Sequence, residues 1–278
     1  MKNFILRKLR EYPSLYKLYL SLRDKRPLTF HGWGMTTSST NPPWVFDNDF
    51  IQEDSTGFRE VDFQLRKKII EKKFVLSQFN NSSEDHLDRL MWRHYFVYWS
   101  ASYALKNTNN KTKVLVECGV CDGLTISYAI GAAKNNASNY KGYLYDAWEG
   151  MRDDLLTDSE KGMATEYSYL QIEETKKNLR ESENNLIYNQ GFIPESFQFS
   201  ENPRQVSWLH IDLNSSIATE AALIFFYDSL ESGGIIIFDD YGWIGYEKTR
   251  SLVDNFFFKK DDSNLIHLPT GQALVFKK

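Results

Sequence analysis

Hydrophobic and polar positions change their pattern at Lys113. From there on, short apolar and β-branched runs alternate with longer stretches of helical periodicity. The apolar runs predict strands near 113–118, 140–146, 185–189, 206–212 and 234–239. The periodic stretches predict helices near 123–135, 166–181, 216–231 and 245–259. Strands that alternate with helices form a mostly parallel sheet with helices on both faces.

The end of this region has a different pattern. Residues 264–276 contain two short apolar runs around Pro269–Gly271, which predicts a hairpin at the sheet edge. The sequence therefore predicts an α/β fold with a doubly wound, mostly parallel, seven-stranded sheet and a C-terminal edge hairpin.

The first part of the chain is predicted to be helical, with one long loop. Helical spacing covers residues 1–26, about 58–79 and 84–106, while residues 27–57 are rich in Pro, Gly, Ser and Thr. We therefore expect two parts: an N-terminal helical extension and lid over 1–105, and a cofactor-binding domain over 106–278.

Charge and composition exclude some classes of protein. The net charge of -4 gives no general reason to expect a nucleic-acid partner. No apolar run reaches the roughly 18 residues that span a bilayer, and the basic start lacks a secretory signal, so we expect a cytoplasmic protein. Residues 1–26 carry eight basic and two acidic side chains. Such a helix can bind a membrane surface or an acidic partner, but more often it packs on its own domain or on a second subunit. We expect a homo-oligomer in which these helices take part.

Two cysteines form a C-x-x-C motif, Cys118 and Cys121. A structural zinc site usually needs four ligands, and the chain has no second pair at suitable spacing. A redox motif can lie between a strand and a helix, so that alternative stays open. The simpler interpretation is two small residues in a tight turn.

Polar and glycine residues gather where the predicted parallel strands end, which is where ligands bind in such sheets. At the ends of the five strands lie, in order, Glu117 with Gly119 and Gly123; Asp146; Asn189 with Gln190, Gly191 and Phe192; His210 with Asp212; and Asp239 with Asp240. Glycines allow close approach of the backbone, and an acidic residue after the second strand can accept the ribose hydroxyls of an adenosine. Gln190 and Phe192 suit the edge and face of an adenine. The pattern predicts an adenosine pocket.

The charge of the first turn favours one cofactor over another. Dinucleotide enzymes use G-x-G-x-x-G to approach a pyrophosphate, whereas here Cys121 replaces a glycine and Glu117 would repel phosphates. S-adenosylmethionine carries a cationic sulfonium and no phosphate, so the charge of this turn favours it over NAD.

Three aspartates could bind a metal ion. Asp212, Asp239 and Asp240 are hard oxygen ligands that suit Mg²⁺.

These residues carry a family resemblance over about 113–278. The region resembles the class I S-adenosylmethionine-dependent methyltransferases, and more narrowly the macrocin O-methyltransferase family. The matching stretches are Val116-Glu-Cys-Gly-Val120 with Gly123, Tyr145-Asp-Ala-Trp-Glu-Gly-Met151, Asn189-Gln-Gly-Phe192, Trp208-Leu-His-Ile-Asp212 with Thr219, Gly233-Gly-Ile-Ile-Ile-Phe-Asp-Asp-Tyr241 and Leu268-Pro-Thr-Gly-Gln272.

The resemblance implies an O-methyltransferase that acts on a sugar hydroxyl of a glycoside, natural product or polysaccharide precursor. It implies that the cofactor is bound by Glu117, Gly119, Gly123, Asp146, Gln190, Gly191 and Phe192. It implies Mg²⁺ bound by Asp212, Asp239 and Asp240. The family commonly shows Asp-x-Asp-x-Tyr where this chain has Asp212-Leu-Asn214-Ser-Ser216, a departure that bears on the acceptor.

The sequence leaves several candidates for the catalytic base and more than one class of protein. Asp212 and His210 are the candidate catalytic residues, although His210 lies deeper and is more often structural at such a position. His31 and His94 are further candidates, and Trp33, Trp44 and Trp148 could stack on an acceptor or pack in a core or lid. Two other classes remain: a nicotinamide-dependent oxidoreductase, and a non-catalytic binding protein on the same fold.

Overall fold

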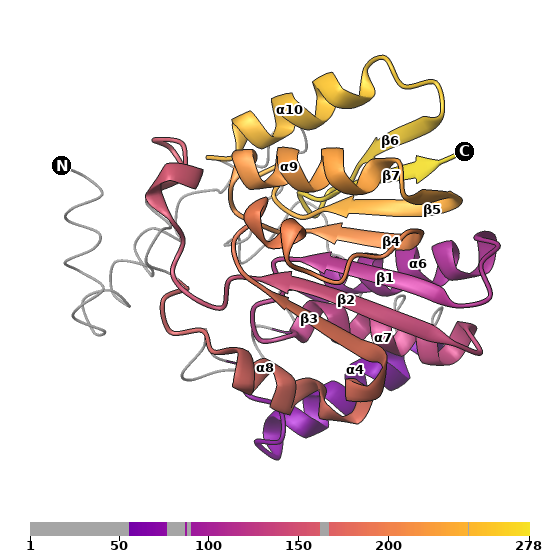
Figure 1. Ribbon diagram of the computed structural model, residues 1–278. Coiled ribbons are helices and arrows are strands. Elements are labelled where there is room, and N and C mark those ends of the chain that lie inside the picture. The colour runs from indigo at the N-terminus through magenta and orange to yellow at the C-terminus, as the bar shows by residue number, and fades with distance from the viewer. Residues whose placement is uncertain (1–55, 77–86, 88–89, 162–166, 244) are drawn as a thin grey trace, which may run out of the picture. The chain divides into compact units, whose positions relative to one another are not determined.

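One sheet organises the part of the chain that the computed structural model describes, which is residues 56–76, 87, 90–161, 167–243 and 245–278. Its seven strands lie in the order β3-β2-β1-β4-β5-β7-β6 (Figure 1). The strands are β1 (Lys113–Cys118), β2 (Tyr140–Asp146), β3 (Leu186–Gln190), β4 (Val206–Ile211), β5 (Leu230–Phe238), β6 (Ser263–His267) and β7 (Ala273–Lys277). The first five pair in parallel, and β7 pairs antiparallel with both β5 and β6. The predicted fold class and edge hairpin are confirmed.

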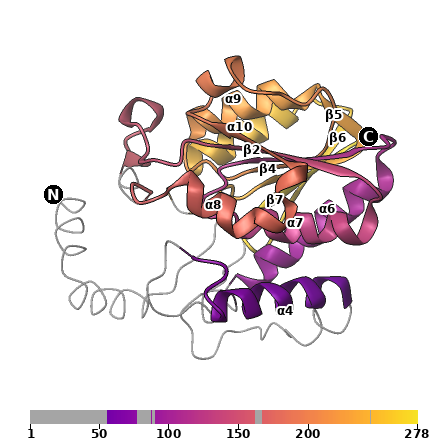
Figure 2. The ribbon, with the colours of Figure 1, turned by 60° about the horizontal axis from the view of Figure 1, so that its bottom comes forward.

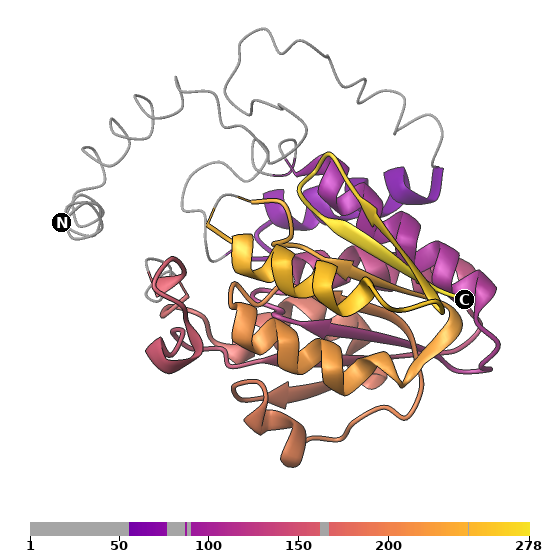
Figure 3. The same cartoon turned by 90° about the horizontal axis from the view of Figure 1, so that it is seen from above.

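Helices cover both faces of this sheet. The α-helices of the described residues are α4 (Thr56–Ile70), α6 (Met91–Asn107), α7 (Leu124–Asn136), α8 (Ile172–Leu179), α9 (Ser216–Tyr227) and α10 (Glu247–Phe257). Figure 2 shows the layers: α9 and α10 on one side of the sheet, α6 and α7 on the other, and α4 outside α7. Figure 3 shows the same two sides from above.

Alternation along the strands divides the core into two clusters. Trp208 of β4 packs among α6 and α7 residues, whereas its neighbours Leu209 and Ile211 pack among residues of α9 and α10. Successive side chains of a strand point to opposite faces, so a strand buried on both faces is apolar throughout. Such strands are recognised as continuous apolar runs in the sequence.

Helices α4 and α6 belong to the same packed unit as the sheet. Phe58 and Leu65 of α4, with Val97 and Leu105 of α6, are buried in one core cluster with Leu115 of β1. The expected boundary between 105 and 106 therefore falls inside α6, near its C-terminal end, and α6 covers the centre of the sheet. Residues 1–55, with the expected basic helix and almost all of the expected loop, lie outside the described residues.

Several predicted element ends differ from the structure, and three of them show why. The helix expected over 58–79 ends at Ile70, because Lys72 adopts a left-handed φ of 54° and the Lys73 N–H turns back to the Lys68 carbonyl. The helix expected over 166–181 begins only at Ile172, after a turn at 167–169. Strand β5 begins four residues earlier than expected, because Gly233 continues the strand with a positive φ instead of breaking it.

The described helices are all too short or too polar to cross a bilayer.

Candidate functional site

A cavity of about 260 Å³ opens where β1, β2, β4 and β5 end. It lies at the carboxyl ends of the parallel strands, where ligands bind in open α/β sheets. Predicted site residues that line it are Gly119, Asp146, Gly191, Phe192, Asp212, Asp239 and Asp240. The other predicted residues, Glu117, Gly123, Gln190 and His210, are not among its lining residues.

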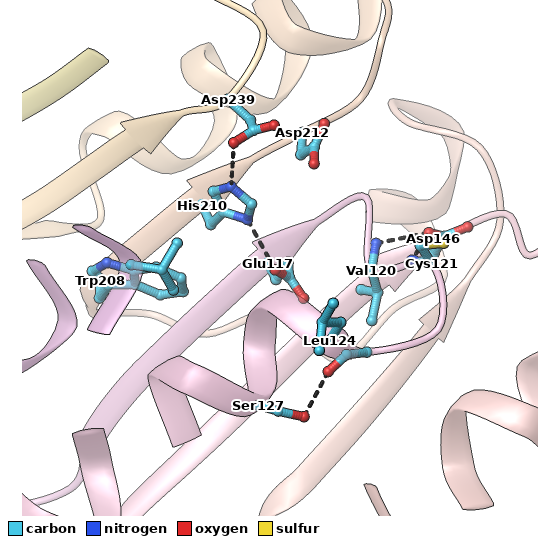
Figure 4. Close-up of polar contacts among 12 residues, drawn as sticks. Glu117, Val120, Cys121, Leu124, Ser127, Asp146, Trp208, His210, Asp212 and Asp239 are labelled. Atoms are coloured by element: carbon cyan, nitrogen blue, oxygen red, sulfur yellow. Dashed lines mark hydrogen bonds and ion pairs between the residues drawn. The ribbon is translucent and has the colours of Figure 1, made fainter. Parts of the chain in front are cut away.

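Asp146 organises the turn that follows β1. Its Oδ2 accepts the backbone N–H groups of Val120 at 2.7 Å and Cys121 at 2.8 Å (Figure 4). Its Oδ1 accepts the backbone N–H of Trp148 at 2.7 Å. Burial raises the pKa of Asp146, although these backbone donors oppose the shift. Each carboxylate oxygen can accept two bonds, so Asp146 shapes the turn and keeps acceptor capacity toward the cavity.

Gly119 is constrained by the protein itself. It has a φ of 89°, and a Cβ there would overlap the carbonyl oxygen of Asp212 on the neighbouring strand. Gly123 also has a positive φ, 86°, and precedes α7 as its N-cap residue. The sequence predicts glycines that let a ligand approach. In the structure, the missing side chain of Gly119 lets the ends of β1 and β4 lie close together.

Glu117 lies beneath the cavity. It is fully buried, and its Oε1 is 2.9 Å from Nδ1 of His210, which is also fully buried (Figure 4). Burial and the nearby carboxylates raise the pKa of Glu117, and burial with the Arg93 charge lowers the pKa of His210 to about 3. His210 is therefore a neutral imidazole at physiological pH, and its Nε2 is 3.8 Å from Oδ1 of Asp239.

The cysteines are both free. Cys118 is buried in the core on the α9 side of the sheet, and Cys121 lines the cavity with a φ of 53°. Burial raises the pKa of both thiols, which disfavours the thiolate needed for redox or metal chemistry. The simpler interpretation of the motif, two small residues in a tight turn, describes their positions.

Trp148, which follows β2, packs in the core and does not line the cavity. Trp148 is 4% exposed, and its indole N–H donates to the Cys121 carbonyl at 3.1 Å and to Thr175 at 2.9 Å. It supports the turn from below. Trp33, Trp44 and His31 lie outside the described residues, while His94 is buried, lines the cavity and stacks on Tyr128.

Residues expected around an adenine lie at the end of β3. Gly191 donates its N–H to the Asp146 carbonyl at 2.9 Å, and Phe192 lies with the Arg152 guanidinium 4.8 Å from its ring centre. Gln190 is exposed, with a contact of 3.5 Å to the Ala147 carbonyl. The structure thus brings Gly191 and Phe192 to the cavity, and Gln190 lies at its margin.

Three aspartates converge at the ends of β4 and β5. Burial raises the pKa of Asp212 and of Asp240, and the Asp212 charge raises that of Asp240 further. Carboxylates that raise each other's pKa in this way favour a proton or a cation between them. Among the described residues, ligand atoms of His210, Asp212 and Asp239 lie within 4.8 Å of one another.

A guanidinium already contacts this cluster. Arg93 of α6 forms a forked ion pair with Asp239, with Nη2 on Oδ2 and with Nε 3.2 Å from Oδ1, and Nη2 is 3.9 Å from Oδ2 of Asp212. Gln272 also donates to Asp239 Oδ1, at 2.9 Å. The carboxylate oxygens therefore suit a hard metal cation, and the Arg93 guanidinium occupies the position beside them.

Sequence reasoning assigned no role to Arg93 or Gln272. Arg93 lies in a helix far upstream, and a lone arginine in a helical pattern carries no local signal. Gln272 ended a stretch that matched the family, but nothing in its spacing indicated that it would reach Asp239. Both depend on the tertiary arrangement.

Comparison with known proteins gives a family match over part of the chain. Residues 116–241 match a family model described as a methyltransferase domain. No match was found among curated proteins.

Solved structures give the fold. The O-methyltransferase NovP has 18% sequence identity and a TM-score of 0.57, with 67% of this chain and 79% of NovP covered. The calicheamicin methyltransferase CalS11 has 15% identity and a TM-score of 0.54, with 85% and 99% covered. The chain has the Rossmann-like fold of the class I methyltransferases, and residues 116–241 of it match a methyltransferase domain.

Proposed function

We propose that the protein is an S-adenosylmethionine-dependent O-methyltransferase of the macrocin O-methyltransferase type, acting on a hydroxyl of a sugar or glycosylated natural product. The observation that carries this is the charge of the cavity. Its described lining includes six carboxylates, Asp122, Asp146, Glu149, Asp212, Asp239 and Asp240, against two guanidiniums, Arg93 and Arg152. Such a lining attracts a sulfonium and an ammonium and repels a pyrophosphate.

Two neighbours support the reaction class. NovP is an O-methyltransferase and CalS11 a calicheamicin methyltransferase, and both share the fold. The proposed acceptor class follows from these relatives and from the sequence resemblance.

Bound S-adenosylmethionine supplies a methyl group that its sulfonium already activates. The chain's residues mainly align donor and acceptor, which can contribute much of the rate. Asp146 would accept the ribose hydroxyls, the turn from Gly119 to Gly123 would hold the methionine end, and Phe192 would contact the adenine. Glu117 does not line the cavity, so it would support the turn from below, held by its contact with His210.

Asp212 is the proposed base for the acceptor hydroxyl. It lines the cavity, and burial raises its pKa, which makes the carboxylate a stronger proton acceptor. His210 does not line the cavity, so its proposed role is to position Glu117 and Asp239.

Mg²⁺ remains part of the proposal. Asp212, Asp239 and Asp240 would hold it, and a bound Mg²⁺ orients hydroxyls and lowers their pKa. Asp239 would first have to leave its ion pair with Arg93.

Calorimetry tests the cofactor. We expect S-adenosylmethionine to bind and NADH to give no heat. Asp146→Asn should weaken S-adenosylmethionine binding at least about tenfold, because one oxygen cannot accept three backbone N–H groups and a ribose. Glu149→Gln is the control, since it removes the same charge from the same cavity without touching the turn.

The alternatives give different results. NADH binding without S-adenosylmethionine binding would indicate an oxidoreductase. Binding of S-adenosylmethionine without methyl transfer to any of a panel of nucleotide sugars, glycosides and phenols would favour a non-catalytic protein.

A further inference from the structure

The position of Arg93 is unusual for a residue outside the methyltransferase match. It projects from α6, which precedes residues 116–241, into the aspartate cluster. Asp239 is 2% exposed, and both of its oxygens are in contact with the guanidinium. A forked guanidinium–carboxylate pair is among the stronger charge-assisted contacts in proteins.

The charges of the cluster are unbalanced. Asp212, Asp239 and Asp240 lie together, and the Arg93 charge opposes the rise in pKa of both Asp212 and Asp240. The second guanidinium of the cavity, Arg152, is committed to Asp154 and Glu195 at 2.9 Å and 2.7 Å. Arg93 is thus the cation on which this cluster depends, among the residues that the structure describes.

Arg93 also stands where a metal would stand. Its Nη2 contacts Oδ2 of Asp239 and is 3.9 Å from Oδ2 of Asp212, so it lies near both carboxylates at once. A divalent ion held by these two aspartates and a guanidinium beside them cannot keep the same contacts, because both need the same oxygen atoms and repel each other.

We propose that Arg93 is the resident counter-cation of the aspartate cluster, and that a divalent metal ion binds only in competition with it. The metal part of this inference rests on the proposed function. In the metal-free protein Arg93 holds Asp239 in place. When the ion binds, the fork on Asp239 opens and the guanidinium moves away from the ion. Arg93 is a positioning residue in this scheme and sets the metal affinity of the site.

Titration of Mg²⁺ into variants tests the competition. We expect Arg93→Gln to bind Mg²⁺ at least about tenfold more tightly than the wild type, because it removes a unit charge beside a dication. Arg152→Gln is the matched control. It removes a cavity arginine that pairs with other carboxylates, so its metal affinity should stay within about twofold of the wild type.

A second measurement uses the wild type alone, in case Arg93→Gln does not fold. The side-chain Nε–H resonance of Arg93 should shift on addition of Mg²⁺ with the same saturation curve as the calorimetric titration. The resonance of Arg152 should stay in place.

The outcomes separate the two proposals. Equal or weaker Mg²⁺ binding by Arg93→Gln, or an Arg93 resonance that ignores bound Mg²⁺, overturns the competition. If neither protein binds Mg²⁺, the competition and the metal part of the proposed function both fail. Binding of S-adenosylmethionine, measured separately, then decides whether the methyltransferase proposal stands.

Discussion

Gly119 joins two strand ends at a point where no side chain fits. Its N–H donates to the Tyr145 carbonyl at 2.8 Å, while the Asp212 N–H donates to the Cys118 carbonyl at 2.8 Å. The three strands β2, β1 and β4 are thereby tied at the edge of the cavity. A Cβ at position 119 would force this junction apart.

We expect Gly119→Ala to lower the free energy of unfolding by more than about 2 kcal/mol, from both backbone strain and overlap with Asp212. Gly245→Ala is the control, because Gly245 has a φ of 100° but open space around the added Cβ. It should cost only the strain, about 1–2 kcal/mol. Urea denaturation of both variants measures the difference, and equal losses would show that the overlap is relieved without cost.

The cofactor turn shows what single residues reveal in a sequence. Gly119, Asp146, Asp212, Asp239 and Asp240 were predicted to meet, because each lies at or just after the end of a strand that could be recognised by its apolar run. Where each side chain points was harder to predict. Glu117 and His210 are paired neighbours on β1 and β4. Each lies two residues after a side chain of the α6 and α7 side of the core, Leu115 or Trp208, so both point to that side of the sheet.

At the scale of elements, α6 is fastened to the centre of the sheet by a buried hydrogen bond. Trp208 of β4 donates its indole N–H to Ser100 at 2.9 Å, and both residues are fully buried. The same hydroxyl donates to the Val97 carbonyl at 3.1 Å. Serine in a helix is ordinarily a weak choice, and here its hydroxyl oxygen is the acceptor that satisfies the buried indole N–H.

Removal of the Ser100 hydroxyl should lower the stability of the folded protein. We expect Ser100→Ala to lower the free energy of unfolding by about 1–3 kcal/mol, because the indole N–H is left buried without a partner. Ser102→Ala provides the comparison, since Ser102 is half-buried on the same helix and only accepts from Asn136 at 3.2 Å. It should change stability by about 0.5 kcal/mol or less. Similar losses in the two variants would contradict this account.

Element type was easier to predict than element ends. Strands β1 and β2 match their predicted ranges because they are apolar and flanked by polar turns. Helix ends depend on local backbone conformation, such as the left-handed Lys72, which carries no side-chain signal.

At the scale of the whole molecule, the two described helices before Lys113, α4 and α6, are part of the core. Phe58, Leu65, Ile69, Met91 and Val97 are each 7% exposed or less and pack in the cluster that contains Leu115 and Trp208. Each such side chain contributes about 1.5–3 kcal/mol on burial. Their sum is comparable with the net stability of a domain, about 5–15 kcal/mol.

A chain that begins at residue 106 should therefore lack cooperative unfolding, whereas one that begins at residue 48 should unfold in one sharp transition. Circular dichroism during heating measures both. A sharp transition in the shorter chain would support an independent domain over 106–278. The predicted boundary arose because the change of pattern at Lys113 is visible in the sequence, while the packing of α6 on the sheet is not.

Asp239 joins parts of the chain that are synthesised at different times. Arg93 is translated first, Asp239 much later, and Gln272 later still, yet all three side chains meet at one carboxylate. The cluster is therefore completed only once residue 272 has emerged, and a nascent chain that stops earlier has the sheet centre but an unfinished site.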